Sequence, residues 1–234
     1  MISELSFPDR IFRDRLERLQ SRKAYSIEYE KILVNKITHS LNENQKVEIH
    51  NAIQFGRNLK YDHPGLDSNQ YFLHPLRVAT LVTDYIINFN LNDLICALLH
   101  NALEVATISQ SELVSSIGFG NAEVIKILTV DRNLQDDKTY KAKYYQEIRQ
   151  NGTSTKIKVL DKFDNIFLLC LNPYPEKREK YLKEIHKEIV PLVKDKIPNL
   201  FDYFMAVVED SESLGYLTSE KSYELFHQDF SSAK

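Results

Sequence analysis

This sequence contains few of the residues that make tight turns. Its 234 residues include six glycines and seven prolines, which is too few for a sandwich or barrel built from many short strands. Hydrophobic residues make up 43% of the chain and charged residues 27%, as in an ordinary globular protein with one sizeable core. The composition therefore argues against a turn-rich β fold.

The sequence also lacks a dominant charge sign and a long hydrophobic run. The formal net charge is −3, so no overall positive field indicates a nucleic acid partner, although a local basic pocket is compatible with it. No segment approaches the roughly 20 apolar residues of a membrane span. The first twenty residues lack the apolar core of a signal peptide. We therefore expect a soluble, cytoplasmic protein with neither a membrane nor a nucleic acid as its partner.

Cysteine is nearly absent. The two cysteines, Cys96 and Cys170, lie in the apolar runs LICALL and FLLCLN. Thiols in such runs are typical of buried residues in a reducing compartment. We expect two buried free thiols rather than a disulfide.

Hydrophobic residues recur every three to four positions along most of the chain, which predicts helices. A polar loop, YDHPGLDSNQ, follows the third helix, and the helix from about Asn90 onward is apolar around most of its circumference. A later helix, TKIKVLDKFDNIFLLC, has Thr153 or Ser154 as its expected cap. The first four predicted helices cover residues 8–20, 27–40, 44–60 (with Asn44 as cap) and 74–88. The pattern predicts an all-α fold of eight to eleven helices in one main domain.

Two of these apolar helices carry polar residues toward the interior. His100 is followed by Asn101, and Glu104 lies one turn further along the same face. Asp161 stands at the edge of an apolar stripe, where a carboxylate needs a metal ion, lysine or arginine beside it. We expect the two helices to share a polar pocket. The simpler alternative is that His100 has a structural role only and forms a hydrogen bond with nearby backbone.

The other histidines give weaker signals. His74 directly precedes Pro75, and we interpret it as the first residue of a helix that bonds nearby backbone. Four more fall on polar helix faces and are expected to be solvated: His39, His50, His186 and His227.

Four blocks in order resemble the hydrolase domain of the RelA/SpoT family, the HD-type enzymes that remove pyrophosphate from ppGpp. The blocks read AIQFGRNLK, YFLHPLRVA, ALLHNALEV and KVLDKFDNI, and EKREKYLKEIHKEIVPL follows them. The small stand-alone alarmone hydrolases are the most similar in size. The resemblance implies an HD-domain-like helical bundle at residues 44–194. It does not cover the flanks, where we expect N-terminal helices at 1–43 packed on this bundle and a C-terminal helical extension at 195–234.

The resemblance also implies a metal site, and this sequence departs from it. The family's ligands are taken as a histidine before the loop, the His-Asp pair and a later aspartate. His100 and Asp161 match the pair's histidine and the later aspartate, but Asn101 replaces the pair's aspartate. Counting back from His74 by the family's spacing puts Lys60 at the first histidine. An amide oxygen binds a hard dication poorly, and an ammonium repels it.

Other family positions are kept in part. Glu104 matches one residue of the acidic pair thought to handle the attacking water, and Val105 replaces the other. Lys162 and Asn165 match the nucleotide-binding arginine and asparagine. The basic RKSG segment of the loop is replaced by GLDSN.

These departures suggest that the Lys60 ammonium takes the place of the metal and neutralises Asp161. Alternatively, Lys60 points to solvent, or His63 supplies a missing imidazole and forms a metal site with His100, Asp161 and Glu104.

Three functions are compatible with this pattern of kept and lost residues. The first is a degenerate, metal-free protein of this fold that binds a guanosine nucleotide, another phosphorylated small molecule or a protein partner. The second is an active phosphohydrolase that uses Mn²⁺ or another divalent metal, with Glu104 handling the attacking water. The third is a structural subunit that docks through its aromatic tail, YELFHQDF.

Overall fold

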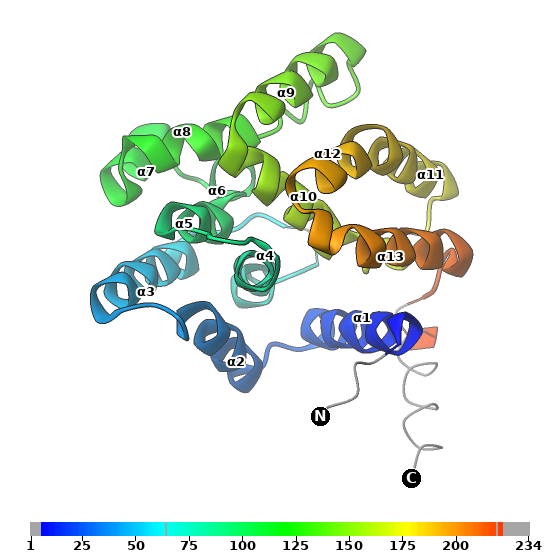
Figure 1. Ribbon diagram of the computed structural model, residues 1–234, viewed down its shortest axis with the longest axis horizontal. Coiled ribbons are helices and arrows are strands. Elements are labelled where there is room, and N and C mark those ends of the chain that lie inside the picture. Colours follow the sequence, from blue (N-terminus) through cyan, green and yellow to red (C-terminus); the bar gives the residue numbers. More distant parts are fainter. Residues whose placement is uncertain (1–5, 64, 219, 222–234) are drawn as a thin grey trace. The chain divides into compact units, whose positions relative to one another are not determined.

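The computed structural model describes residues 6–63, 65–218 and 220–221, and all their regular elements are helices (Figure 1). Thirteen α-helical segments are present in this part of the chain. Two of them continue their predecessors: α6 follows α5 after one turn, and α12 follows α11 through a π-helical stretch, which leaves eleven separate helices. The all-α prediction, with eight to eleven helices, is confirmed. The tail YELFHQDF lies outside the described residues.

The chain divides into two compact units. The larger consists of residues 25–161, and the smaller combines residues 1–24 with 162–234. These limits differ from residues 43 and 194, where the resemblance placed domain boundaries, so the three-part division stays a prediction. None of the helices in the described ranges is long and apolar enough to cross a membrane.

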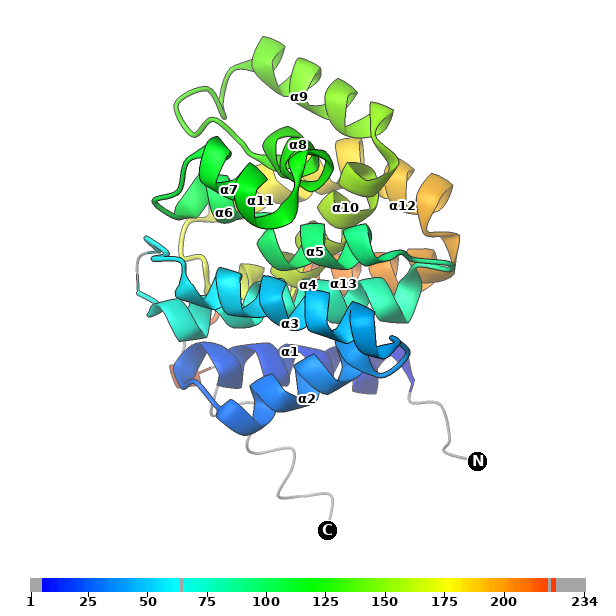
Figure 2. The ribbon, with the colours of Figure 1, turned by 90° about the vertical axis from the view of Figure 1, so that its left-hand side faces the viewer.

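The larger unit is built around α4 and α5, which pack against each other; α2 covers α4, and α3 covers α5 (Figure 1). In Figure 2, α2, α3, α5 and α8 follow one another from bottom to top as successive layers of this unit. Seven consecutive residues of α5, from Asp93 to Leu99, are buried, so this helix is central, as its apolar sequence predicts. The helices of this unit are α2 (Ile27–Thr38), α3 (Glu43–Asn58), α4 (Ser68–Tyr85), α5 (Leu91–Leu99), α6 (Ala102–Val105), α7 (Gln110–Ile117), α8 (Phe119–Leu128), α9 (Lys138–Gln150) and most of α10 (Gly152–Ile166).

Side chains that cap the helices correct three sequence-based boundaries. Asn42, not Asn44, caps α3, and it does so in a capping box with Gln45. Asp67 caps α4, which starts at Ser68, six residues before the expected start, so Pro75 lies inside the helix. Asn151 accepts a hydrogen bond from the Ser154 backbone, so the cap of α10 precedes both expected residues. Neighbouring Asn, Thr and Ser residues compete as caps of α3 and α10, which explains why these two caps differ from the expected ones by two or three positions.

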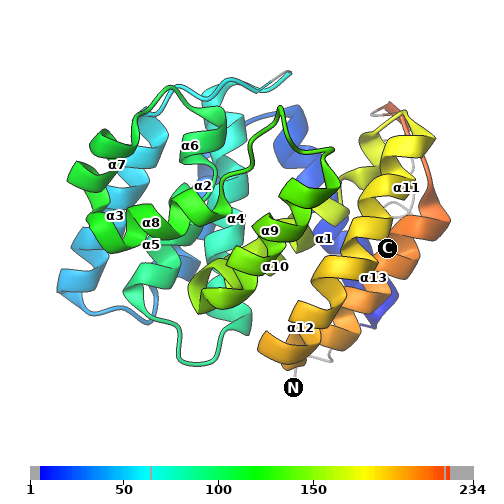
Figure 3. The same cartoon turned by 90° about the horizontal axis from the view of Figure 1, so that it is seen from above.

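The smaller unit contains α1 and the helices that follow α10. Figure 3 shows α12 and α13 side by side, and α1 also contacts α13. Arg18 Nε donates to Asp164 Oδ1 at 2.8 Å, and both side chains are buried. Asp164 thus serves an ion pair in the core of this unit. The elements here are α1 (Phe7–Lys23), η1 (Leu169–Leu171), α11 (Pro175–Glu184), η2 (Ile185–Ile189), α12 (Val190–Lys196), η3 (Pro198–Leu200) and α13 (Phe201–Leu214).

Both cysteines are buried and free, which confirms the prediction. Burial raises the pKa of the Cys96 thiol to about 12 and raises that of Cys170 as well.

Candidate metal centre

Three residues from three helices of the larger unit converge on one point. His74 comes from the middle of α4, His100 from the C-terminal end of α5, and Asp161 from α10. One ligand atom from each lies within 4.8 Å of the others. The Nε2 atoms of His74 and His100 lie 3.2 Å and 3.6 Å from the same oxygen, Oδ1 of Asp161. Two imidazole nitrogens and one carboxylate oxygen therefore face a common centre.

A hydrogen bond to the backbone fixes the orientation of the His100 ring. Its Nδ1 lies 2.7 Å from the backbone oxygen of Ala97, so Nδ1 carries the proton and donates it. The side chain is only 2% exposed, and among the described residues its Nε2 has no hydrogen-bond partner. A backbone bond at one ring nitrogen that leaves the other free is the usual arrangement of a metal-binding histidine. The buried polar group without a partner is the observation that a metal ion would explain.

Asp161 divides its two oxygens between different partners. Oδ1 faces the two imidazoles, whereas Oδ2 accepts from the Lys158 ammonium at 3.2 Å. Burial alone would raise the pKa of Asp161, but Lys158 and the two histidines outweigh it and hold this pKa well below its usual value. Burial would lower the pKa of Lys158, yet Tyr144 and Asp161 raise it well above its usual value. The carboxylate and the ammonium are therefore both charged near neutral pH.

The structure corrects the role expected of Lys60. The segment after α3 lies beside the end of α6, where the Asp62 amide donates to the Val105 backbone oxygen at 2.8 Å. Lys60 is exposed there. The ammonium that contacts Asp161 belongs instead to Lys158, three residues earlier on the same helix. It contacts the oxygen that faces away from the histidines, so it does not stand between them in the place of a metal.

His74 is the candidate ligand that the sequence pattern did not reveal. It is not the first residue of a helix but lies one turn beyond Tyr71 inside α4, and its side chain is 13% exposed. A usable signal was present, since His74 is part of YFLHPLRVA, one of the blocks that carry the resemblance. His63, proposed as a substitute ligand, packs its ring 5.2 Å from that of Tyr71.

Asn101 lies directly after His100, between α5 and α6. Its Nδ2 donates to the Tyr71 hydroxyl at 2.8 Å, which fixes the amide and leaves its Oδ1 as the only atom able to bind a cation. Burial, with smaller effects from Asp161 and Glu104, raises the pKa of Tyr71 above its ordinary value, so its hydroxyl stays neutral.

Glu104 lies on α6, within one turn of Asn101. Its Oε1 is 3.4 Å from Nε of Arg132, and its charge raises the pKa of Lys158 and of Tyr71. Glu104 is thus near the cluster, partly accessible to solvent, and held by an arginine from the loop after α8. Its expected part in handling water remains a prediction.

The two residues expected to bind nucleotide belong to the smaller unit. The ammonium of Lys162 lies 3.0 Å from Glu184 Oε1 and 4.5 Å from the centre of the Tyr181 ring. Asn165 is half-buried near the end of α10. Their expected role in nucleotide binding stays a prediction.

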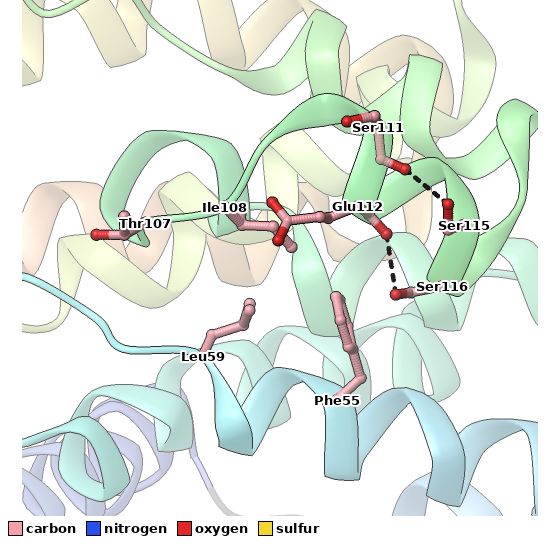
Figure 4. Close-up of a pocket in the computed structure, with 8 residues that line it drawn as sticks. All are labelled: Phe55, Leu59, Thr107, Ile108, Ser111, Glu112, Ser115 and Ser116. Carbon is pink, nitrogen blue, oxygen red and sulfur yellow. Dashed lines mark hydrogen bonds between the residues drawn. The ribbon is translucent and has the colours of Figure 1, made fainter.

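A separate pocket in the larger unit offers less chemistry. It has a volume of about 470 Å³ and lies between the end of α3 and α7, with Phe55, Leu59 and Ile108 as its apolar residues (Figure 4). The Ser115 and Ser116 hydroxyls donate to backbone oxygens one turn earlier, as the dashed lines in Figure 4 show. Nothing in this pocket matches the donor set of His74, His100 and Asp161, so the latter is the candidate site.

Comparison with known proteins decides the fold. No family model matches this chain, and no curated protein matches it in sequence. Among solved structures, a metazoan orthologue of SpoT that hydrolyses ppGpp and plays a role in starvation responses is similar, with a TM-score of 0.57 and 20% sequence identity. The match covers 74% of this chain and 97% of that one. The chain has the fold of a ppGpp hydrolase.

The HD-type fold expected from the four sequence blocks is thereby confirmed. At 20% identity the likeness concerns the fold and leaves the activity open.

Proposed function

We propose that this chain is a metal-dependent phosphohydrolase of the HD type, weakened by the loss of one acidic ligand, whose substrate is a pyrophosphorylated guanosine nucleotide such as ppGpp. The convergence of His74, His100 and Asp161, with the Nε2 of His100 lacking a partner among the described residues, is the observation that carries the proposal. The substrate class is suggested by the activity of the metazoan SpoT orthologue with the same fold.

His74, His100 and Asp161 would hold the ion, and a divalent ion there would supply Lewis-acid polarisation of a phosphoryl oxygen. The hydrogen bond to the Ala97 backbone orients the His100 ring for metal binding, and the ion pair with Lys158 orients the Asp161 carboxylate. Glu104 is the nearby carboxylate that would orient a water molecule and accept its proton. Its Oε1 lies 3.4 Å from Nε of Arg132, a contact that would help to hold the carboxylate in place.

Two features set the expected strength of the activity. Asn101 supplies a neutral oxygen in place of a carboxylate, which weakens the hold on a hard dication. Lys162, the proposed nucleotide contact, is already paired with Glu184, so a nucleotide phosphate must compete with that carboxylate. Both features support slow turnover rather than an efficient enzyme.

A metal-free nucleotide-binding protein is the second candidate. One specific observation favours it: Lys158 already compensates the charge of Asp161, so the cluster does not need a metal ion to stay folded. The two candidates differ in metal content and turnover but share the nucleotide.

The deciding experiment measures pyrophosphate release from ppGpp by protein purified without chelator, with and without added Mn²⁺ or Zn²⁺. We expect slow, metal-dependent release that disappears in His100→Ala and persists in His50→Ala, since His50 is exposed on α3. If ppGpp raises the melting temperature but is not hydrolysed, and the protein contains no metal, the second candidate is correct. Absence of both binding and hydrolysis would refute the nucleotide assignment.

A further inference from the structure

Asn101 has a consequence for the identity of the metal, which rests on the proposed function. The candidate centre contains two imidazoles and a single carboxylate oxygen. Donor sets of two histidines and one carboxylate are those of catalytic zinc sites. Mg²⁺, Ca²⁺ and Mn²⁺ instead favour sites rich in carboxylate and carbonyl oxygens.

The charge available to an ion is lower than the number of acidic residues suggests. Asp161 contributes one negative charge, but its Oδ2 already accepts from Lys158 at 3.2 Å. Both side chains are 9% exposed, so water screens their attraction only weakly. The carboxylate and the ammonium together carry no net charge. A hard dication, whose binding depends mostly on charge, therefore gains little here, whereas the nitrogen donors of His74 and His100 are unaffected.

The position next to His100 is where a second carboxylate would restore that charge. Asn101 occupies it with a neutral amide, whose Nδ2 donates to the Tyr71 hydroxyl at 2.8 Å. An aspartate at this position could accept from the same hydroxyl with one oxygen and still offer the other to a cation. Because Asn and Asp have nearly the same size, this single exchange changes the charge of the site and preserves its shape.

We propose that Asn101 sets the metal preference of this protein, so that the centre accepts a nitrogen-preferring ion of the zinc type and excludes manganese and magnesium. The two histidines supply most of the affinity for such an ion. The neutral amide of Asn101 supplies no anionic oxygen, which Mn²⁺ and Mg²⁺ need for tight binding.

The test compares dissociation constants for Zn²⁺ and Mn²⁺, measured by calorimetry on chelator-treated, dialysed protein. Almost any site binds Zn²⁺ more tightly than Mn²⁺, so the informative quantity is how the ratio of the two constants changes on mutation. We expect Asn101→Asp to strengthen Mn²⁺ binding by at least about tenfold and Zn²⁺ binding by clearly less, because the added donor is a charged oxygen.

Asn51→Asp is the matched control, since it adds the same charge at an exposed position on α3 and should leave the ratio unchanged. If Asn101→Asp strengthens the binding of both ions equally, the inference is overturned. It is also overturned if Asn51→Asp changes the ratio of the two dissociation constants as much as Asn101→Asp does. Neither result would contradict the metal site itself. If neither ion binds the wild-type protein, the proposed function fails together with it.

A measurement on the wild-type protein keeps the inference testable should Asn101→Asp not fold. Zn²⁺ at about 10 μM should raise the melting temperature, whereas Mn²⁺ or Mg²⁺ at the same concentration should not. Stabilisation by Mn²⁺ equal to that by Zn²⁺ would contradict the proposed preference.

Discussion

His100 directs its Nε2 toward Oδ1 of Asp161 across 3.6 Å, while its Nδ1 is engaged 2.7 Å from the Ala97 backbone oxygen. With the ring proton on Nδ1, the Nε2 atom presents a lone pair to a carboxylate oxygen. Two lone pairs that face each other repel, so the arrangement is stable when a proton or a cation lies near both atoms. This relationship and the packing around it lead to testable consequences for metal binding and stability.

Replacing His74 tests the ligand assignment that the structure changed. We expect His74→Ala to abolish the rise in melting temperature that Zn²⁺ produces, because one of two imidazole donors is lost. Lys60→His should leave the zinc response unaltered, since residue 60 is exposed. Differential scanning fluorimetry with and without zinc measures both. A larger zinc-induced rise in melting temperature in Lys60→His would contradict this assignment and show that residue 60 can bind the metal.

Removing the Lys158 ammonium leaves Asp161 buried without its charged partner. Lys158→Met should therefore lower the free energy of unfolding by about 3–5 kcal/mol in chelator, measured by urea denaturation. Added zinc should recover part of this loss, because the ion supplies a positive charge beside the same carboxylate.

The control for Lys158→Met is Lys46→Met, which removes an ammonium from the pair with Glu43, also three residues apart but largely exposed on the Glu43 side. Its cost should be at most about 1 kcal/mol. Equal losses in the two variants would show that burial of the Lys158–Asp161 pair has no energetic consequence.

Gly56 tests the close packing of α3 in the larger unit. A Cβ at this position would lie 2.5 Å from Cε2 of Phe72 and 3.0 Å from Cδ2 of Leu99. Gly56→Ala should destabilise the protein by about 1–3 kcal/mol, although alanine is the better helix former. Gly120→Ala, which has open space around its Cβ, should be neutral or stabilising. Chemical denaturation of the two variants gives the comparison, and an unchanged stability of Gly56→Ala would contradict this packing.

The thiols provide a pH-based prediction. Burial raises the pKa of Cys96 to about 12, so at pH 8 its reactive thiolate form is very scarce, and Cys170 is shifted in the same direction. Native protein at pH 8 should react slowly with Ellman's reagent, whereas unfolded protein should release two equivalents rapidly. A fast-reacting thiol in the native protein would show that one of the two is accessible.

Much of the fold was predictable because hydrophobic spacing alone indicates helices. The burial of α5 follows from its apolar residues on nearly every side, and the two cysteines lie in similarly apolar runs. Helix starts were less predictable, because Asn42 and Asn44 are equally good caps by composition. Only the geometry of the first turn shows that Asn42 bonds to Gln45.

The sequence by itself determined the helical class and identified His100, Asn101 and Asp161 as polar residues among apolar neighbours. It could not determine which residues face Asp161, because His74, His100 and Asp161 come from helices separated by tens of residues. Tertiary packing of α4, α5 and α10 brought His74 to the cluster and left Lys60 exposed. The physical reason is that helix periodicity fixes which face a side chain occupies, whereas the packing of helices decides which faces meet.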